Sequence, residues 1–273
     1  MMLGTLEPPS CAYPIGSVLT LSATGSEWNH AFVISKRETQ EKMALTTPVT
    51  YPLFSLVDPT YQLTLPLRQL RNGVYDAMIH AIDATFVPTV LPLLDDFQLC
   101  VLKELIEIGP KVIQSNPSYE FVNRLALAAS FACNFLYRSP VKATCFGIHC
   151  IGHMLTAKYG IDHGATLSII TCPLLQEFLN ERKAILAKAA ETIWNATGTT
   201  EQKAQACIDN LRKFIAEIGQ PLKCSDVEGV VVQEGDVDII TKMVFKSTKG
   251  NNLGVNGTIT EEITRKILSQ VVK

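Results

Sequence analysis

Four of the five histidines in this chain fall in two short motifs that could bind a metal ion. Asp76 and His80 are four residues apart, and so are His149 and His153. On a helix, residues at this spacing share one face, so each pair could present two ligand atoms together. His163 follows His149 by 14 residues. On one unbroken helix that separation is about 21 Å. The two could therefore share one metal, at about 2 Å from each, only if the chain turns back between them.

The donor atoms indicate which metals would fit. One carboxylate oxygen with three imidazole nitrogens suits a divalent transition ion such as Zn²⁺ or Fe²⁺ and matches Mg²⁺ or Ca²⁺ poorly. The surrounding sequence is apolar and low in charge, where several histidines without a common partner would be costly. The Asp76/His80 pair alone is also typical of a hydrogen bond along a helix face. The residue types leave open whether His149 or His153 would be the ligand.

Helices must position most of these residues. From about residue 65 onward, apolar side chains recur with a helical period. This pattern predicts helices over residues 95–108, 119–136, 181–194, 201–218 and 258–273. The turn required between His149 and His163 is predicted at Gly160, because glycine readily adopts the left-handed conformation that ends a helix.

Several helix ends carry their own signals. Gly198 and Gly219 are predicted to close the helices that precede them. Residues 258–261 resemble a capping box, with Thr258 as the first residue and Glu261 as the last, and this predicts the start of the final helix.

The N-terminal part differs from the rest. Residues 1–60 contain short β-rich runs at 16–21 and 31–35, separated by proline and glycine. The sequence therefore predicts a mainly α protein, with a small β-containing piece over residues 1–60 and a helical domain over residues 61–273. A domain of that length is within the usual range.

Composition excludes several classes of protein. The chain is 47% hydrophobic and 18% charged, with a formal net charge of −2, so it is not a disordered chain and carries no basic field for nucleic acid or anionic lipid. Its most apolar stretch, residues 125–137, is shorter than the roughly 20 residues that span a bilayer. Eight cysteines without a CxxC pair, after an N-terminus without a signal peptide, indicate reduced thiols and a cytoplasmic protein.

Ordered motifs along the chain carry a resemblance to a known family. They lie at residues 18–29, 41–42, 51–59, 76–80, 149–157 and 159–163. Together they resemble the iron-type (group III) metal-dependent alcohol dehydrogenases, and more narrowly the NADPH-dependent butanol dehydrogenase and aldehyde reductase branch. The resemblance implies that residues 61–273 form the helical metal-binding domain of the dehydroquinate synthase-like fold, and that residues 1–60 are a remnant of the α/β cofactor domain.

The same resemblance implies roles for individual residues. The metal ligands would be Asp76, His80, His149 and His163, holding one Fe²⁺ or Zn²⁺. His153 would line the pocket near the reacting carbon, as a substrate contact or proton relay. Three further residues would lie beside NADP(H) or NAD(H), namely Thr20, Thr24 and Lys42. The implied reaction is the interconversion of a small alcohol and its aldehyde, with the metal as Lewis acid.

The sequence departs from the family pattern in ways that bear on activity. No two of the 16 glycines are adjacent, so the paired-glycine loop for a pyrophosphate is missing. Asp83 stands where the family usually has glutamate. These departures predict a truncated chain that lacks most of the cofactor domain and does not turn over by itself. The face on which the missing part of the cofactor domain would pack should be exposed and apolar. A second copy or another partner is therefore expected to cover it.

Two alternatives remain at this stage. The first is a catalytically inactive metal-binding domain or scaffold paralogue, which would bind metal without binding NAD(P)H. The second is a hydrolase that uses a metal-activated water. The motifs show no further carboxylate pairing of the kind that two-metal hydrolases need, so the hydrolase ranks last.

Overall fold

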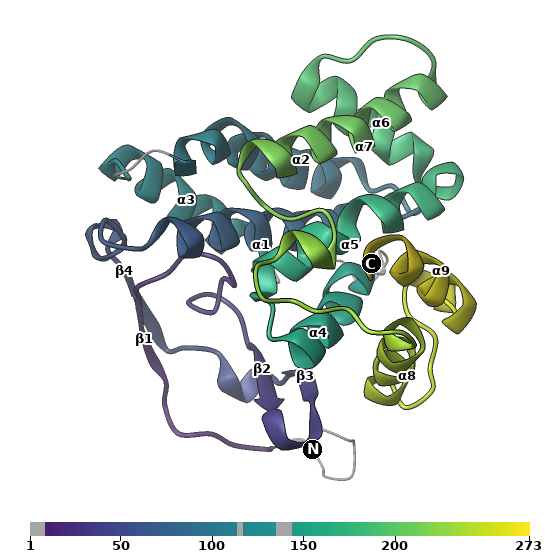
Figure 1. The fold of residues 1–273 in the computed structure, drawn as a ribbon. Coiled ribbons are helices and arrows are strands. Elements are labelled where there is room, and N and C mark those ends of the chain that lie inside the picture. The colour runs from purple at the N-terminus through teal and green to yellow at the C-terminus, as the bar shows by residue number, and fades with distance from the viewer. Residues whose placement is uncertain (1–8, 114–116, 135–143) are drawn as a thin grey trace.

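Two small sheets form the N-terminal part of the structure (Figure 1). The computed structural model describes residues 9–113, 117–134 and 144–273. Strand β1 (Gly16–Leu19) pairs in parallel with β4 (Phe54–Val57), and β2 (Ala31–Lys36) pairs antiparallel with β3 (Glu41–Thr46). Sequence patterns indicated β1 and β2 but not their partners.

Helices make up most of the remaining chain, so the predicted mainly α fold is confirmed. The helices of the described residues are α1 (Leu67–Thr85), α2 (Pro92–Ile108), α3 (Tyr119–Ala132), α4 (Gly147–Tyr159), α5 (His163–Glu177), α6 (Leu179–Trp194), α7 (Thr200–Glu217), α8 (Asp236–Ser247) and α9 (Glu261–Val271). The helix predicted over 119–136 ends at Ala132, and residues 135–136 lie outside the described residues.

Helix α1 runs through the middle of the helical part and packs against α2, α3, α4 and α5 (Figure 1). Its residues from Gly73 to Asp83 are all buried. Most of these are apolar, such as Tyr75 and Met78, and burying side chains of this size stabilises a fold by about 1.5–3 kcal/mol each. The polar residues of the same stretch are therefore fixed within the core.

The predicted turn between His149 and His163 is confirmed. Helix α4 ends at Tyr159, Gly160 adopts a left-handed conformation with φ of 73°, and α5 begins at His163. Such a φ is easily reached only by glycine. The chain reverses there, and α4 and α5 pack against each other.

Two predicted helix caps are wrong. Helix α6 ends at Trp194 and is capped by Asn195, in a left-handed conformation that asparagine tolerates, rather than by Gly198. Helix α9 is capped by Thr260, whose side chain accepts a hydrogen bond from the backbone of Ile263. Thr258 cannot begin this helix, because the adjacent Ile259 pairs with Leu253 in a short β-bridge.

The two strands β1 and β4 expose large apolar side chains. Val18 is 55% exposed on β1, and Phe54 and Leu56 are 61% and 56% exposed on β4. The apolar surface expected from the sequence is therefore present on this sheet. Among the described residues, none of the helices combines the length and apolar character that crossing a membrane would require.

Candidate metal centre

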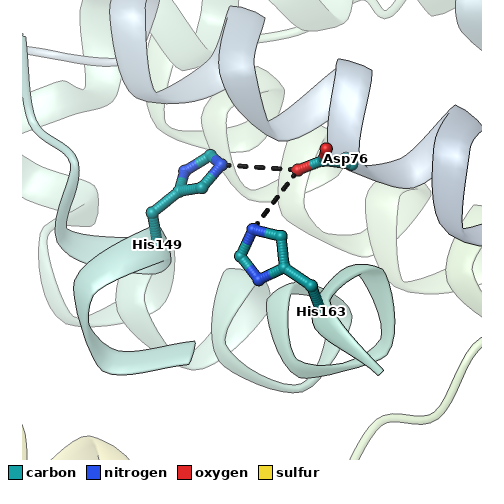
Figure 2. A group of neighbouring side chains, drawn as sticks. All are labelled: Asp76, His149 and His163. Atoms are coloured by element: carbon teal, nitrogen blue, oxygen red, sulfur yellow. Dashed lines mark ion pairs between the residues drawn. The ribbon is translucent and has the colours of Figure 1, made fainter. Parts of the chain in front are cut away.

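Three helices bring an aspartate and two histidines to one point. Asp76 comes from the middle of α1, His149 from the first turn of α4 and His163 from the first residue of α5. Figure 2 shows the two imidazole rings pointing at the same carboxylate. One ligand atom of each residue lies within 4.8 Å of the others.

The distances in this group fit a metal ion. The Oδ1 atom of Asp76 lies 3.5 Å from His149 Nε2 and 3.6 Å from His163 Nε2. In a tetrahedral site with bonds of about 2.0–2.1 Å, neighbouring ligand atoms are about 3.4 Å apart. Hydrogen bonds between nitrogen and oxygen are shorter, at about 2.7–3.2 Å. The three atoms therefore surround a point at ligand spacing.

Buried polar atoms in this group have no hydrogen-bond partner. Within the part of the chain that the structure describes, this holds for Asp76 Oδ1 and His149 Nε2, which are the atoms that face each other. Because buried polar atoms almost always have partners, each exception needs an explanation. A cation between them would satisfy both, so these residues fit a divalent metal.

His80 lies beside the group rather than in it. Its Nδ1 atom is 3.9 Å from Asp76 Oδ1, and its ring stacks on His149 with centroids 4.6 Å apart. Burial opposes protonation of this ring, but the interactions with Cys133 and Asp76 raise the pKa of His80 above the ordinary histidine value. The structure thus brings three of the four predicted ligands together and places the fourth beside them.

Charge interactions stabilise the ionised carboxylate. Burial opposes ionisation of Asp76, but the charge of His80 and the interactions with His149 and His163 outweigh it and hold the pKa of Asp76 well below its usual range. For His163, burial and the charge of Lys42 outweigh Asp76 and lower the pKa to about 3. His163 is therefore neutral near pH 7, as a metal ligand must be.

Asp83 orients one of the imidazoles. Its Oδ2 lies 2.7 Å from His149 Nδ1, on the side of the ring away from Asp76. Burial opposes protonation of His149, but the carboxylates of Asp76 and Asp83 outweigh it and raise its pKa to about 9, so a metal ion that binds at Nε2 displaces a proton. A carboxylate behind a ligand histidine fixes the ring and makes it a better donor. The sequence offered one signal for this role, because Asp83 follows Asp76 by seven residues and so shares its helix face.

The metal-ligand candidates lie at one wall of a cavity of about 1190 Å³. This large cavity is also lined by His153, Lys42 and Thr24. Burial lowers the pKa of Lys42 to about 8 and lowers the pKa of His153 well below its usual range. Thr20 is exposed, and it is not among the described residues that line this cavity.

A mainly α fold with buried carboxylate and imidazole groups at ligand spacing defines a metal-binding protein. Two family models identify which one. A model described as "Fe-containing alcohol dehydrogenase family, C-terminal" matches residues 71–270, and one described as "Iron-containing alcohol dehydrogenase" matches residues 3–59. The chain belongs to the iron-containing alcohol dehydrogenase family.

Individual relatives agree with this assignment. The NADPH-dependent aldehyde reductase YqhD of Escherichia coli is 35% identical over 94% of this chain. The NADH-dependent butanol dehydrogenase B of Clostridium acetobutylicum is 32% identical over 93% of it. The crystal structure of NADH-dependent butanol dehydrogenase A from Thermotoga maritima superimposes with a TM-score of 0.90 at 28% identity, over 100% of this chain and 69% of that one. The chain spans 65% of YqhD and 66% of the Clostridium protein.

Proposed function

We propose that this chain carries the metal-binding and substrate-binding part of an NAD(P)-linked alcohol dehydrogenase or aldehyde reductase. The observation that supports it most directly is the convergence of Asp76, His149 and His163 at ligand spacing in the wall of a large cavity. Relatives named as alcohol dehydrogenases and aldehyde reductases suggest the reaction, and they include both NADPH- and NADH-dependent proteins.

In this proposal, Asp76, His149 and His163 hold one divalent ion, and His80, whose Nδ1 atom lies 3.9 Å from Asp76 Oδ1, completes the set. Fe²⁺ is the proposed ion because of the family, and the same donor set also suits Zn²⁺. When bound, the ion supplies Lewis acidity at an alcohol or aldehyde oxygen. Asp83 keeps the Nε2 atom of His149 directed at the centre, through its bond to Nδ1.

Other cavity residues have proposed roles in positioning and proton transfer. The ring of His153 lies 4.9 Å from that of His163 between centroids, and burial keeps it neutral. As a neutral ring that lines the large cavity, it can contact the substrate oxygen, or relay a proton by accepting one at one nitrogen while it releases one from the other. Lys42 and Thr24 would contact the nicotinamide cofactor. Thr20 would contact the same cofactor only if the cofactor extends beyond the large cavity.

We assign metal binding and cofactor binding to different parts of the chain. Residues 61–273 would form the metal-binding domain, and residues 1–60 would belong to the cofactor side, where β2 and β3 supply Val33 and Lys42 to the large cavity. The apolar surface of β1 and β4 would be covered by a second copy, a partner or further chain. This surface would then lie at the junction with the rest of the cofactor site.

The test is metal and cofactor binding measured separately. After anaerobic reconstitution with Fe²⁺, we expect one ion per chain and loss of that ion in Asp76→Leu. NADPH-dependent aldehyde reduction is expected only when the cofactor site is completed. A chain that binds no metal would contradict the proposal. Metal without any NAD(P)H binding, measured by fluorescence titration, would favour the inactive metal-binding scaffold instead.

A further inference from the structure

The metal centre is bordered by two cavities. Asp76 and His163 line the large cavity, and both also line a second cavity of about 250 Å³ between the start of α1 and the start of α5. We name this second space the Asp162 cavity, after the carboxylate among its lining residues. One water molecule takes about 30 Å³ of liquid, so the Asp162 cavity has room for several.

The side chain of Asp162 faces this cavity and not its own helix. Asp162 directly precedes α5, a position where aspartate ordinarily accepts a hydrogen bond from the first backbone N–H groups. Within the described residues 144–273, its side chain makes no such bond to the helix. Its Oδ2 atom instead accepts a hydrogen bond from Asn72 Nδ2 at 2.9 Å and lies 3.2 Å from Arg68 Nη1. The chain thus holds a carboxylate beside the cavity where a helix cap would be expected.

The two carboxylates of the Asp162 cavity differ in exposure. The Asp162 side chain is 35% exposed, whereas that of Asp76 is 4% exposed, so the first lies nearer the solvent and the second at the metal centre. Arg68 is 72% exposed, and ion pairs this open to solvent are weak and easily broken. A negatively charged pocket with low-dielectric walls attracts cations. Moving Arg68 aside would leave such a pocket in front of Asp76.

The inner wall of this cavity is held rigidly. The Oδ1 atom of Asn72 accepts a hydrogen bond from Gln220 Nε2 at 3.0 Å. Gly164 packs so closely that an added Cβ would lie 2.7 Å from the Cα atom of Asn72. Since the wall on this side is fixed, the exposed Arg68 side chain is the part of the cavity that moves most easily.

We propose that the Asp162 cavity is the route by which a divalent metal ion reaches and leaves the metal centre. Asp162 attracts the hydrated ion, and Arg68 is the displaceable cover. This inference rests on the proposed function, because it needs metal at Asp76, His149 and His163. In this arrangement the metal ion and the organic ligands enter by different cavities. The metal uses the Asp162 cavity, and the organic ligands use the large cavity.

The rates of metal uptake and release test this route without an activity assay. Uptake of Co²⁺ by the metal-free chain is followed by visible absorbance after rapid mixing, and release by transfer to a chelator. We expect Asp162→Asn to slow uptake by about tenfold and Arg68→Ala to speed it severalfold, with a weaker salt dependence for Asp162→Asn. Because a route changes the barrier more than the bound state, the equilibrium affinity should move by less than about threefold.

Matched controls remove the effect of net charge. Asp238 and Arg265 form an ion pair of 2.7 Å between α8 and α9, at exposed positions. Asp238→Asn and Arg265→Ala make the same charge changes as the test variants and should leave both rates unchanged. An equal effect of the two sets would overturn the proposed route, because it would show that overall charge alone attracts the ion.

Two bulky substitutions locate the route by obstruction. Gln69→Trp fills the Asp162 cavity and Val33→Trp narrows the large cavity. Slower uptake and release in Gln69→Trp alone would support the route, and slowing in Val33→Trp alone would overturn it. A wild-type chain that binds no metal would overturn the proposed function, and the route with it. Normal affinity with unchanged rates in every variant would overturn the route alone.

Discussion

Two buried aspartates of this protein have opposite surroundings. Asp76 in the metal centre and Asp236 at the start of α8 are 3% and 1% exposed. The carboxylate of Asp236 is close to its partners, with Lys158 Nζ at 2.8 Å, Tyr159 Oη at 2.7 Å and the backbone nitrogen of Gln233 at 2.9 Å. Around Asp76, the imidazole nitrogens stay 3.5–3.9 Å away.

The difference separates a structural site from a binding site. The partners of Asp236 lie at ion-pair or hydrogen-bond distance, so that cluster holds α4 and α8 together. Asp76 and its neighbours leave room for one ion at about 2 Å from each ligand atom. Asp76 should therefore matter for binding and Asp236 for stability, and the following predictions test that contrast.

The largest expected effect is on stabilisation by metal. A ligand present at 1,000 times its Kd stabilises the folded state by about 4 kcal/mol. In Asp76→Leu this stabilisation should vanish, because the carboxylate that would face the ion is gone. Urea unfolding with and without metal measures it. A stabilisation by metal that survives in Asp76→Leu would contradict the contrast.

Asp236→Asn should have the opposite effects: it should lower the stability of the fold and leave metal binding unchanged. It removes the charge that neutralises Lys158, whose side chain is only 19% exposed, and the expected loss in the free energy of unfolding is about 2–3 kcal/mol. Metal stoichiometry should stay at the wild-type value. The control is Asp238→Asn two residues along the same helix, where the exposed ion pair with Arg265 should contribute less than about 1 kcal/mol.

Asp83 tests whether the residue behind a ligand matters. In Asp83→Asn the partner of His149 Nδ1 becomes neutral, and we expect metal affinity to fall by about 10- to 100-fold. Competition against a chelator of known affinity measures this change. Restoring a carboxylate with Asp83→Glu should recover part of it. Equal affinities in all three chains would show that Asp83 serves packing alone.

Local features of the metal centre were predictable from the sequence. The spacing of Asp76 and His80 follows from helix geometry, and the distance between His149 and His163 required a turn that Gly160 permits. These inferences used only neighbours within about 15 residues. The caps of α6 and α9 were predicted less well, because Asn195 takes the place expected for Gly198 and because the bridge of Ile259 to Leu253 depends on tertiary pairing.

Long-range partners could not be derived in the same way. Asp83 meets His149 across 66 residues, and Lys158 meets Asp236 across a similar separation. Nothing in the local sequence distinguishes such a pair from two unrelated charges. Likewise, the spacing from Asp76 makes His80 a candidate ligand and the family resemblance names it as one, but its stacking on His149 joins α1 to α4 and depends on the tertiary fold.

The smallest expected effect is on the free energy of unfolding at acidic pH. Burial opposes ionisation of Asp236, but Lys158, Gln233 and Tyr159 lower its pKa below the ordinary aspartate value. A carboxylate with a lowered folded-state pKa contributes stability above its unfolded pKa of about 3.9, and this is lost as the pH falls through the folded value. The difference in unfolding free energy between wild type and Asp236→Asn should therefore be constant from pH 7 to about pH 5 and shrink below about pH 4. Chemical unfolding of the metal-free chains across this range measures it, and a difference that grew toward low pH would show that Asp236 is not held as the ion.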